Sequence, residues 1–262
     1  MINGEVIKMF GRNNPVIVSE EDSSAKNMLE LHNIHVNYGK SKIINGLSMS
    51  VEQGDKLVIM GRNGVGKTTL IKSIIGLLPS ASGSIYFCNN DVTKTPPSER
   101  SAGGIAYVPQ GREILPDFTV EENLELGAMA HMKGSDQNIT KRKEMVYDYF
   151  PVLKEHLNRK GGVLSGGQQQ QLAIGRALMS KPSMILLDEP TDGIQPNVVA
   201  DLANTLNRIR KELFVTVVIV EQNLKFAFRI AEKYVILQKG EIVSSGLTTE
   251  LTDDIVKKYL SV

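Results

Sequence analysis

The sequence has few of the features that mark secreted, nucleic-acid-binding or membrane-spanning proteins. One cysteine, Cys88, occurs in 262 residues, so the chain cannot form an internal disulfide, which suits a reducing compartment. The formal net charge is +1 and provides no overall field to attract nucleic acid or an anionic membrane. We therefore expect partners to be recognised by local surfaces, and we expect no nucleic acid among them.

Long apolar runs are also missing. The longest, such as residues 184–187 and 217–220, fall far short of the roughly 18 residues that a membrane-spanning helix needs. Residues 1–27 lack the apolar core and cleavage site of a signal peptide, and they mix glycine, asparagine and proline with a polar stretch. We predict that residues 1–27 are a disordered or loosely attached extension, with an interaction arm as the alternative.

From residue 28 onward, the sequence predicts one α/β unit in which strands alternate with helices. A strand at 56–60 runs into glycine-rich sequence, and apolar residues at helical spacing follow at 69–78. The remaining elements expected of this unit are strands at 28–38, 43–51, 184–187, 215–220 and 234–237, and a helix at about 197–213.

A helical subdomain is predicted between the two halves of this α/β core, at approximately 112–179. Residues 119–122 have the sequence of a capping box, which marks the start of a helix. The polar residues 133–143 interrupt the helical pattern, and we interpret them as an exposed linker between helices.

The segment 61–68 fits the pattern G-x-x-x-x-G-K-[ST] and lies between the predicted strand and helix, as a phosphate-binding loop requires. Glycines let successive backbone N–H groups point at phosphate oxygens, and the helix dipole adds positive potential. Lys67 would neutralise the β- and γ-phosphates, and Thr68 would offer a hydroxyl to Mg²⁺. The predicted nucleotide-binding residues of this loop are Gly61, Arg62, Asn63, Gly64, Val65, Gly66, Lys67, Thr68 and Thr69.

An acidic pair, Asp188 and Glu189, follows the apolar strand 184–187. Asp188 fits the role of holding Mg²⁺, directly or through water, and Glu189 that of polarising the attacking water. Acidic residues after a strand also serve simply as helix N-caps. The phosphate loop in the same chain favours the catalytic interpretation.

A second glycine-rich helix start, 164–168, carries Ser165, Gly166, Gly167 and Gln168, and it too suits an anion. The γ-phosphate held by this chain is already surrounded by the chain's own loop. We therefore predict that the second anion site serves a nucleotide bound elsewhere.

These motifs, in this order, resemble the ATP-binding cassette (ABC) family over nearly the whole chain from residue 28. The resemblance implies a P-loop NTPase core with an antiparallel β subdomain and an inserted α-helical subdomain. It also implies ATP and Mg²⁺ as ligands, and a head-to-tail pair of subunits in which 164–168 of one closes over the ATP of the other. Tyr38 matches the aromatic residue that stacks on adenine, and Gln110 matches the glutamine that links metal and water to the helical subdomain.

Two positions depart from the family pattern. Gln195 stands in place of the usual aspartate after the acidic pair, and Gln222 stands in place of the histidine that contacts the γ-phosphate. The Gln222 amide still donates a hydrogen bond, but it carries no charge and cannot shuttle a proton. Slower hydrolysis, or a purely positioning role for Gln222, is therefore expected.

The amino-acid sequence at 61–66, 109–113, 168–171 and 193–196 is most similar to that of the ATP-binding subunit of urea importers. The expected function is thus to power import of urea, with a branched-chain amino acid importer as the alternative. The expected location is the cytoplasmic face of the cell membrane, peripheral through permease subunits. A second, paralogous ATPase would complete a heterodimer, and a solute-binding protein would act indirectly. An ABC ATPase without a membrane partner and a binding module that barely hydrolyses ATP are the other candidates.

Overall fold

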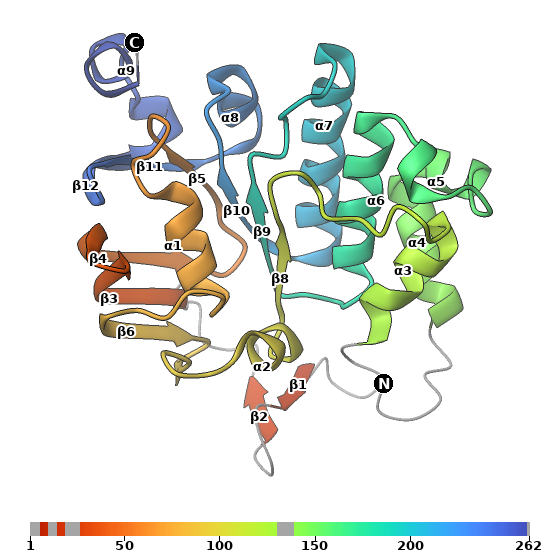
Figure 1. Ribbon diagram of the computed structural model, residues 1–262, viewed down its shortest axis with the longest axis horizontal. Helices are drawn as coiled ribbons and strands as arrows, with labels where there is room; N and C mark the ends of the chain where they lie inside the picture. The colour runs from red at the N-terminus through yellow and green to blue at the C-terminus, as the bar shows by residue number, and fades with distance from the viewer. Residues whose placement is uncertain (1–5, 10–14, 19–26, 130–138, 261–262) are drawn as a thin grey trace.

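The computed structural model describes residues 6–9, 15–18, 27–129 and 139–260. A six-stranded sheet of order β12-β11-β5-β10-β9-β8 forms its centre (Figure 1). All neighbouring pairs are parallel except β11 with β12. The strands are β5 (Lys56–Met60), β8 (Ile105–Val108), β9 (Met184–Asp188), β10 (Thr216–Val220), β11 (Lys233–Gln238) and β12 (Glu241–Leu247).

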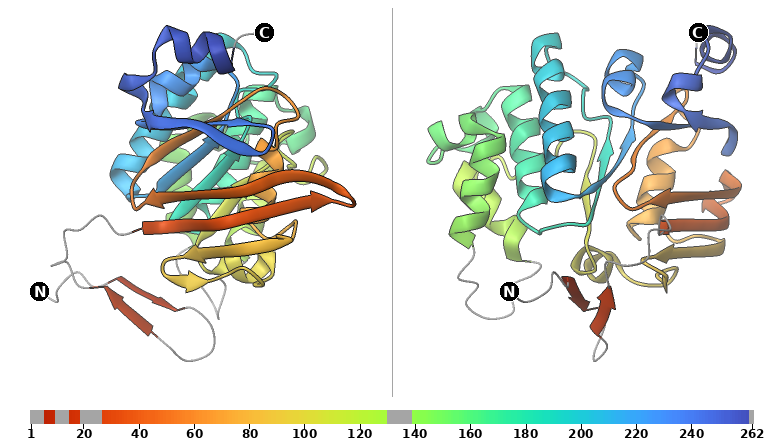
Figure 2. Two further views of the ribbon diagram at one scale, coloured as in Figure 1. Left: turned by 90° about the vertical axis from the view of Figure 1, so that its left-hand side faces the viewer. Right: turned by 180° about the vertical axis from the view of Figure 1, so that it is seen from behind.

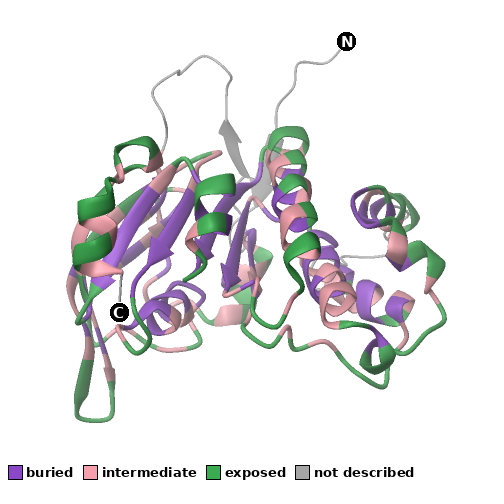
Figure 3. Ribbon diagram, turned by 90° about the horizontal axis from the view of Figure 1, so that it is seen from above, coloured by how far each residue is buried: buried purple, intermediate pink, exposed green. Residues whose placement is uncertain are grey.

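The central strands are buried on both faces because helices cover both sides of the sheet, as Figure 3 shows. Successive side chains of a strand point to opposite faces. On β10, Val218 and Val220 therefore join the core on one side, and Val217 and Ile219 the core on the other. This double burial explains why these strands appear in the sequence as continuous apolar runs.

One face of the sheet packs against α1 (Lys67–Ile74), which in turn lies against a four-stranded antiparallel sheet (Figure 2). That sheet has the order β4-β3-β6-β7. Its strands are β3 (Asn27–Tyr38), β4 (Ser41–Glu52), β6 (Ser82–Phe87) and β7 (Asn90–Asp91), and the short helix α2 (Pro97–Ala102) follows them.

The other face packs against α7 (Pro196–Leu213) and α8 (Leu224–Ile230). A helical group lies beyond them and occupies the chain between β8 and β9 (Figure 1). It comprises α3 (Val120–Met129), α4 (Ile139–Tyr149), α5 (Pro151–Glu155), the 3₁₀ turn η1 (Gly161–Val163) and α6 (Gly166–Leu178). The fold class expected from the sequence is therefore the one observed.

The capping box at the start of α3 is formed as predicted. The Thr119 backbone N–H donates to Glu122 Oε2 at 2.7 Å, and the Glu122 N–H donates to Thr119 Oγ1 at 3.1 Å. The two side chains thus satisfy two backbone donors that the first turn of a helix leaves free.

The interpretation of residues 133–143 as a linker is wrong for residues 139–143, which lie in α4. Arg142 is buried and donates to the Met179 carbonyl at 3.0 Å, while Lys143 Nζ pairs with Glu121 and Glu125 of α3 at 2.6 and 3.0 Å. These basic side chains reach partners on neighbouring helices, so their polarity does not mark a loop. Residues 133–138 lie outside the described residues.

The predicted extension contains a small antiparallel sheet, formed by β1 (Val6–Met9) and β2 (Pro15–Val18). These two strands were not expected from the sequence, and disorder or loose attachment of residues 1–27 stays a prediction. At the other end, β12 leads into η2 (Thr248–Glu250) and α9 (Asp253–Tyr259). Within the described residues, none of the helices combines the length and apolarity that a membrane span requires.

Candidate nucleotide site

The glycine-rich loop connects the end of β5 to the start of α1. Gly66 has φ of 108°, a conformation that suits glycine, and it leads into Lys67, the first residue of the helix. At Gly61 a Cβ would lie 2.5 Å from the Leu237 carbonyl oxygen, so the loop could not follow this path with a larger residue there. Lys67 Nζ donates to the carbonyls of Gly61 and Arg62 at 2.9 and 3.1 Å. The loop therefore curls around its own lysine.

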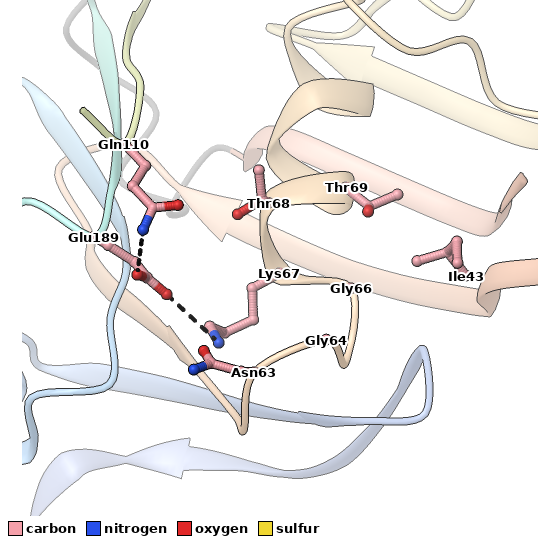
Figure 4. Close-up of a pocket in the computed structure, with 9 residues that line it drawn as sticks. All are labelled: Ile43, Asn63, Gly64, Gly66, Lys67, Thr68, Thr69, Gln110 and Glu189. Carbon is pink, nitrogen blue, oxygen red and sulfur yellow. Dashed lines mark hydrogen bonds and ion pairs between the residues drawn. The ribbon is translucent and has the colours of Figure 1, made fainter. Parts of the chain in front are cut away.

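A cavity of about 460 Å³ opens beside this loop (Figure 4). Its walls come from the loop, the start of α1, strand β4, the segment after β8 and the segment after β9. The lining residues are Ile43, Asn63, Gly64, Gly66, Lys67, Thr68, Thr69, Gln110 and Glu189. All except Ile43 were among the residues predicted from the sequence.

Four of the residues predicted to contact this chain's own nucleotide do not line this cavity: Tyr38, Gly61, Arg62 and Val65. Gly61 and Arg62 hold Lys67 through their carbonyls, and Val65 packs against the core shared by α1 and the antiparallel sheet. Tyr38 ends β3 with 51% of its surface exposed, so its ring is accessible. Stacking of Tyr38 on adenine stays a prediction.

Lys67 is only 5% exposed, and burial lowers its pKa because the ammonium is removed from water. Glu189, Asp188 and Glu221 oppose this effect and favour the charged form. The Glu189 carboxylate lies nearest, with Oε1 3.8 Å from Nζ. The cluster of acids thus helps to keep a cation at the point where phosphates would lie.

Thr68 and Asp188 are brought together as a metal site requires. Thr68 Oγ1 donates to Asp188 Oδ1 at 3.1 Å, and Tyr107 donates to Oδ2 at 3.3 Å. Burial raises the pKa of Asp188, while the hydrogen bonds from Thr68 and Tyr107 lower it. Hydroxyl and carboxylate oxygens suit Mg²⁺, which usually takes one or two protein ligands and completes its shell with water and phosphate. These residues therefore fit the expected ion.

Glu189 accepts hydrogen bonds from two other predicted site residues. Its backbone φ of 45° is left-handed, which is unusual outside glycine and turns the carboxylate toward the cavity (Figure 4). Gln222 Nε2 donates to Oε1 at 2.6 Å, and Gln110 Nε2 donates to Oε2 at 2.9 Å. Three predicted residues from three separate strand ends thus meet at one carboxylate.

Sequence reasoning missed the residues that hold the Gln110 segment in place. Arg112 Nη2 donates to the Asp192 carbonyl at 2.7 Å, and Arg176 Nη2, from α6, donates to the Glu113 carbonyl at 2.7 Å. Arg112 and Glu113 both have left-handed backbones, with φ of 72° and 45°. No sequence motif assigns a contact to Arg112, two residues after Gln110, or to Arg176 of α6. The structure alone reveals the hydrogen bonds that these two residues make.

Ser165 is the N-cap of α6 and forms a capping box with Gln168. The Ser165 backbone N–H donates to Gln168 Oε1 at 2.9 Å. Gly166 approaches the loop after Glu189, because a Cβ there would lie 3.1 Å from the Gly193 carbonyl oxygen. None of residues 165–168 lines the cavity at Lys67. Gln195, the other departure from the family pattern, is the N-cap of α7 and makes no capping bond through its side chain.

Comparison with known proteins is consistent with this geometry. A family model described as ABC transporter matches residues 44–192, more than half of the chain. The chain is 38% identical to the high-affinity branched-chain amino acid transport ATP-binding protein BraG of Pseudomonas aeruginosa, over 82% of this chain and 91% of that protein. It is 33% identical to a probable branched-chain amino acid transport ATP-binding protein, LivF, of Archaeoglobus fulgidus, over 86% and 94% of the two chains.

Solved structures give the same result. A nucleotide-free ATP-binding cassette from an ABC transporter superposes with a TM-score of 0.77 at 30% identity, covering 90% of this chain and 96% of its own. A dimeric ATP-binding cassette in a post-hydrolysis state, bound to ADP and Pi, superposes with a TM-score of 0.76 at 27% identity, covering 84% and 98%.

Replacing Lys67 tests the phosphate loop. We expect Lys67→Ala to weaken Mg-ATP binding at least about 100-fold, or about 2.8 kcal/mol, because a desolvated cation beside the phosphates is lost. Isothermal calorimetry with Mg-ATP measures the effect. Lys56→Ala is the matched control, since Lys56 lies at the opposite end of β5 and pairs with Glu232. Equal affinity in the wild type and Lys67→Ala would contradict the assignment.

Replacing Gln222 by histidine tests the role of an uncharged donor. The amide donates at every pH, so wild-type kcat should not follow a titration near pH 6.5, the ordinary histidine pKa, whereas the Gln222→His variant should (pKa about 6.5). The protonated imidazole adds a positive charge beside the γ-phosphate and loses it as the pH rises. The ratio of variant to wild-type kcat should therefore fall between about pH 6 and pH 8. A constant ratio would show that residue 222 does not act on the reacting phosphate.

Proposed function

This chain belongs to the ABC transporter family, and from that premise we propose that it is the ATPase subunit that powers an importer of a small amino-acid- or amide-type solute. As a family member it binds ATP and hydrolyses it. The observation that carries the proposal is the meeting of Lys67, Gln110, Glu189 and Gln222 at the carboxyl edge of the parallel sheet.

The site residues divide the work of hydrolysis between them. Lys67 and the N–H groups of the loop neutralise and orient the phosphates, and Glu189 accepts the proton of the attacking water. Gln110 and Gln222 hold the Glu189 carboxylate by its two oxygens and so direct it. Thr68 and Asp188 would hold Mg²⁺, which when bound would supply neutralisation of phosphate charge.

The transported solute is assigned by likeness, since it would bind to other subunits. The relatives reported above are named for branched-chain amino acid transport. They favour that class, which was the alternative drawn from the sequence. Urea, the first expectation, receives no support from these relatives, and only the residues at 61–66, 109–113, 168–171 and 193–196 favour it. Branched-chain amino acids are accordingly our first candidate and urea the second.

A docking surface for a permease is offered by the loop that follows Gln110. Leu115, Phe118 and Val163 are exposed by 38%, 42% and 72%, and their segments are joined by a hydrogen bond from the Gly161 N–H to the Phe118 carbonyl at 2.8 Å. Exposed apolar clusters of this kind mark interaction sites. We refer to Leu115, Phe118 and Val163 as the apolar patch.

Asn123 of α3 holds the Leu115 and Phe118 segments of the apolar patch by hydrogen bonds. Asn123 is fully buried, and its Nδ2 donates to the carbonyls of Leu115, Phe118 and Thr119. Arg112 and Arg176 then hold the stretch between the apolar patch and Gln110. A permease helix docked on the apolar patch would therefore act on Gln110 through a stiff connection.

A second ATPase subunit is part of the proposal, because Ser165–Gln168 of this chain do not line its own cavity. We propose a heterodimer with a paralogous chain that carries histidine at the position of Gln222. Permease subunits would hold the pair at the cytoplasmic face of the membrane, and a solute-binding protein would act on the other side.

Deletion of the gene tests the transport function. Uptake of labelled leucine should fall to background in the deletion strain and return with the wild-type chain. It should not return with Glu189→Gln, which keeps the shape of Glu189 but cannot accept a proton. Uptake of labelled urea, measured in parallel, separates the two solutes. Undiminished uptake of both would overturn the importer proposal in favour of an ABC ATPase with another task.

Polar substitution of the apolar patch tests permease docking. We expect Phe118→Ser with Val163→Ser to abolish uptake while basal ATPase activity stays within about twofold, because large apolar side chains dominate the energy of interfaces. Phe214→Ser is the matched control, since Phe214 is 76% exposed but lies at the far end of α7, next to the start of β10. Normal uptake in the double variant would place the permease elsewhere.

A further inference from the structure

Glu221 is a buried carboxylate next to Gln222, and beyond its electrostatic effect on Lys67 it makes contacts of its own. It is 4% exposed, and within residues 27–129 and 139–260 no lysine, arginine or histidine forms an ion pair with it. Burying a charge without a counter-ion is costly unless hydrogen bonds compensate. A residue that carries such a cost beside an active site is a candidate for a functional role.

Three donors supply the compensation. The backbone N–H groups of Gln222 and Asn223 donate to Glu221 Oε1 at 2.8 and 2.9 Å, and Thr191 Oγ1 donates to Oε2 at 2.9 Å. Hydrogen bonds to a charged acceptor are stronger than neutral ones. One carboxylate thus joins the segment after β10 to the segment after β9.

The position of Glu221 is itself fixed by the sheet. Its backbone N–H donates to the Ile59 carbonyl of β5 at 3.2 Å. Val220, one residue earlier, pairs with Asp188 in the parallel register, and its carbonyl accepts from the Glu189 N–H at 2.9 Å. Glu221 is therefore anchored between the strand that leads to the phosphate loop and the strand that carries Glu189.

The hydrogen bonds of Glu221 hold the chain segments of both partners in the contact between Gln222 and Glu189. On one side they fix the backbone of Gln222, whose amide reaches Glu189 Oε1 at 2.6 Å. On the other side they fix Thr191, two residues after Glu189. We propose that Glu221 is a positioning residue that aligns Gln222 with Glu189 for hydrolysis, and this inference rests on the roles given to those two residues above.

The negative charge of Glu221 also favours the charged form of Lys67, by raising its pKa. Positioning and charge predict different results for two substitutions. Glutamine keeps an acceptor for the two backbone N–H groups, and its amide donates to the Thr191 hydroxyl, which also accepts hydrogen bonds. Alanine removes every acceptor.

The test is steady-state ATPase activity of the full-length chain, in the assembly in which the wild type turns over, at ATP concentrations that span KM. We expect Glu221→Ala to lower kcat at least about tenfold with KM within about threefold, the pattern of a lost transition-state interaction. Glu221→Gln should stay within about threefold of wild type. An equal loss in both variants would overturn positioning and assign the effect to charge.

A double-mutant cycle identifies the residue through which Glu221 acts. In a Gln222→Ala background, Glu221→Ala should lower kcat by no more than about twofold further, because the contact that it aligns is already gone. Independent, multiplicative losses would overturn the proposal. If Glu221→Ala does not fold, Thr191→Val replaces it in the cycle and should lower kcat by a smaller factor that also disappears without Gln222.

The test of Glu221 and the uptake test of the importer proposal can fail independently. Wild-type ATPase activity without uptake of leucine or urea would contradict the importer proposal and leave this inference standing. Normal uptake and turnover in Glu221→Ala would overturn the inference and leave the importer proposal intact.

Discussion

The parallel pairing of β5, β10, β9 and β8 is the constraint on which the site depends. Parallel strands bring their carboxyl ends to one edge of a sheet, and ligands of open α/β folds bind outside that edge. Here the edge carries the phosphate loop after β5, Glu221 and Gln222 after β10, Asp188 and Glu189 at the end of β9, and Gln110 after β8. Because β10 lies between β5 and β9, Gln222 follows a strand that is flanked by the strand leading to the phosphate loop and the strand leading to Glu189. The chemistry thus follows from the order of strands.

The sequence predicts those parts of this arrangement that depend on the pattern of residues within one short segment. Continuous apolar runs indicate strands that are buried on both faces, and the spacing of glycines with Lys67 and Thr68 indicates a phosphate loop whatever the rest of the fold. Prediction fails where partners lie far apart in the sequence. Lys143 of α4 has its acidic partners, Glu121 and Glu125, on α3, and Ile43 reaches the cavity from the antiparallel sheet.

Other parts of the site needed the structure for a different reason. The motif identified Glu189 but not its left-handed backbone. Arg112 lies within residues 109–113, which resemble urea importers, but no motif assigns a structural role to Arg112, Arg176 or Glu221. Each of these three residues acts by satisfying backbone groups of a loop. Such contacts depend on the path of two chain segments at once, which no periodicity of one segment records.

The two glutamines around Glu189 define the electrostatics of the site. Gln110 and Gln222 donate to opposite oxygens of one carboxylate, and neither can gain or lose a proton at physiological pH. With histidine at position 222, two groups near the γ-phosphate would be able to exchange protons. With glutamine there, the proposed mechanism leaves the proton of the attacking water one acceptor among these three side chains, which is Glu189. In the role proposed for it, Gln222 contributes by geometry alone, so that role depends on how well its backbone is held. The buried carboxylate of Glu221 accepts hydrogen bonds from the backbone N–H groups of Gln222 and Asn223 and so holds this segment.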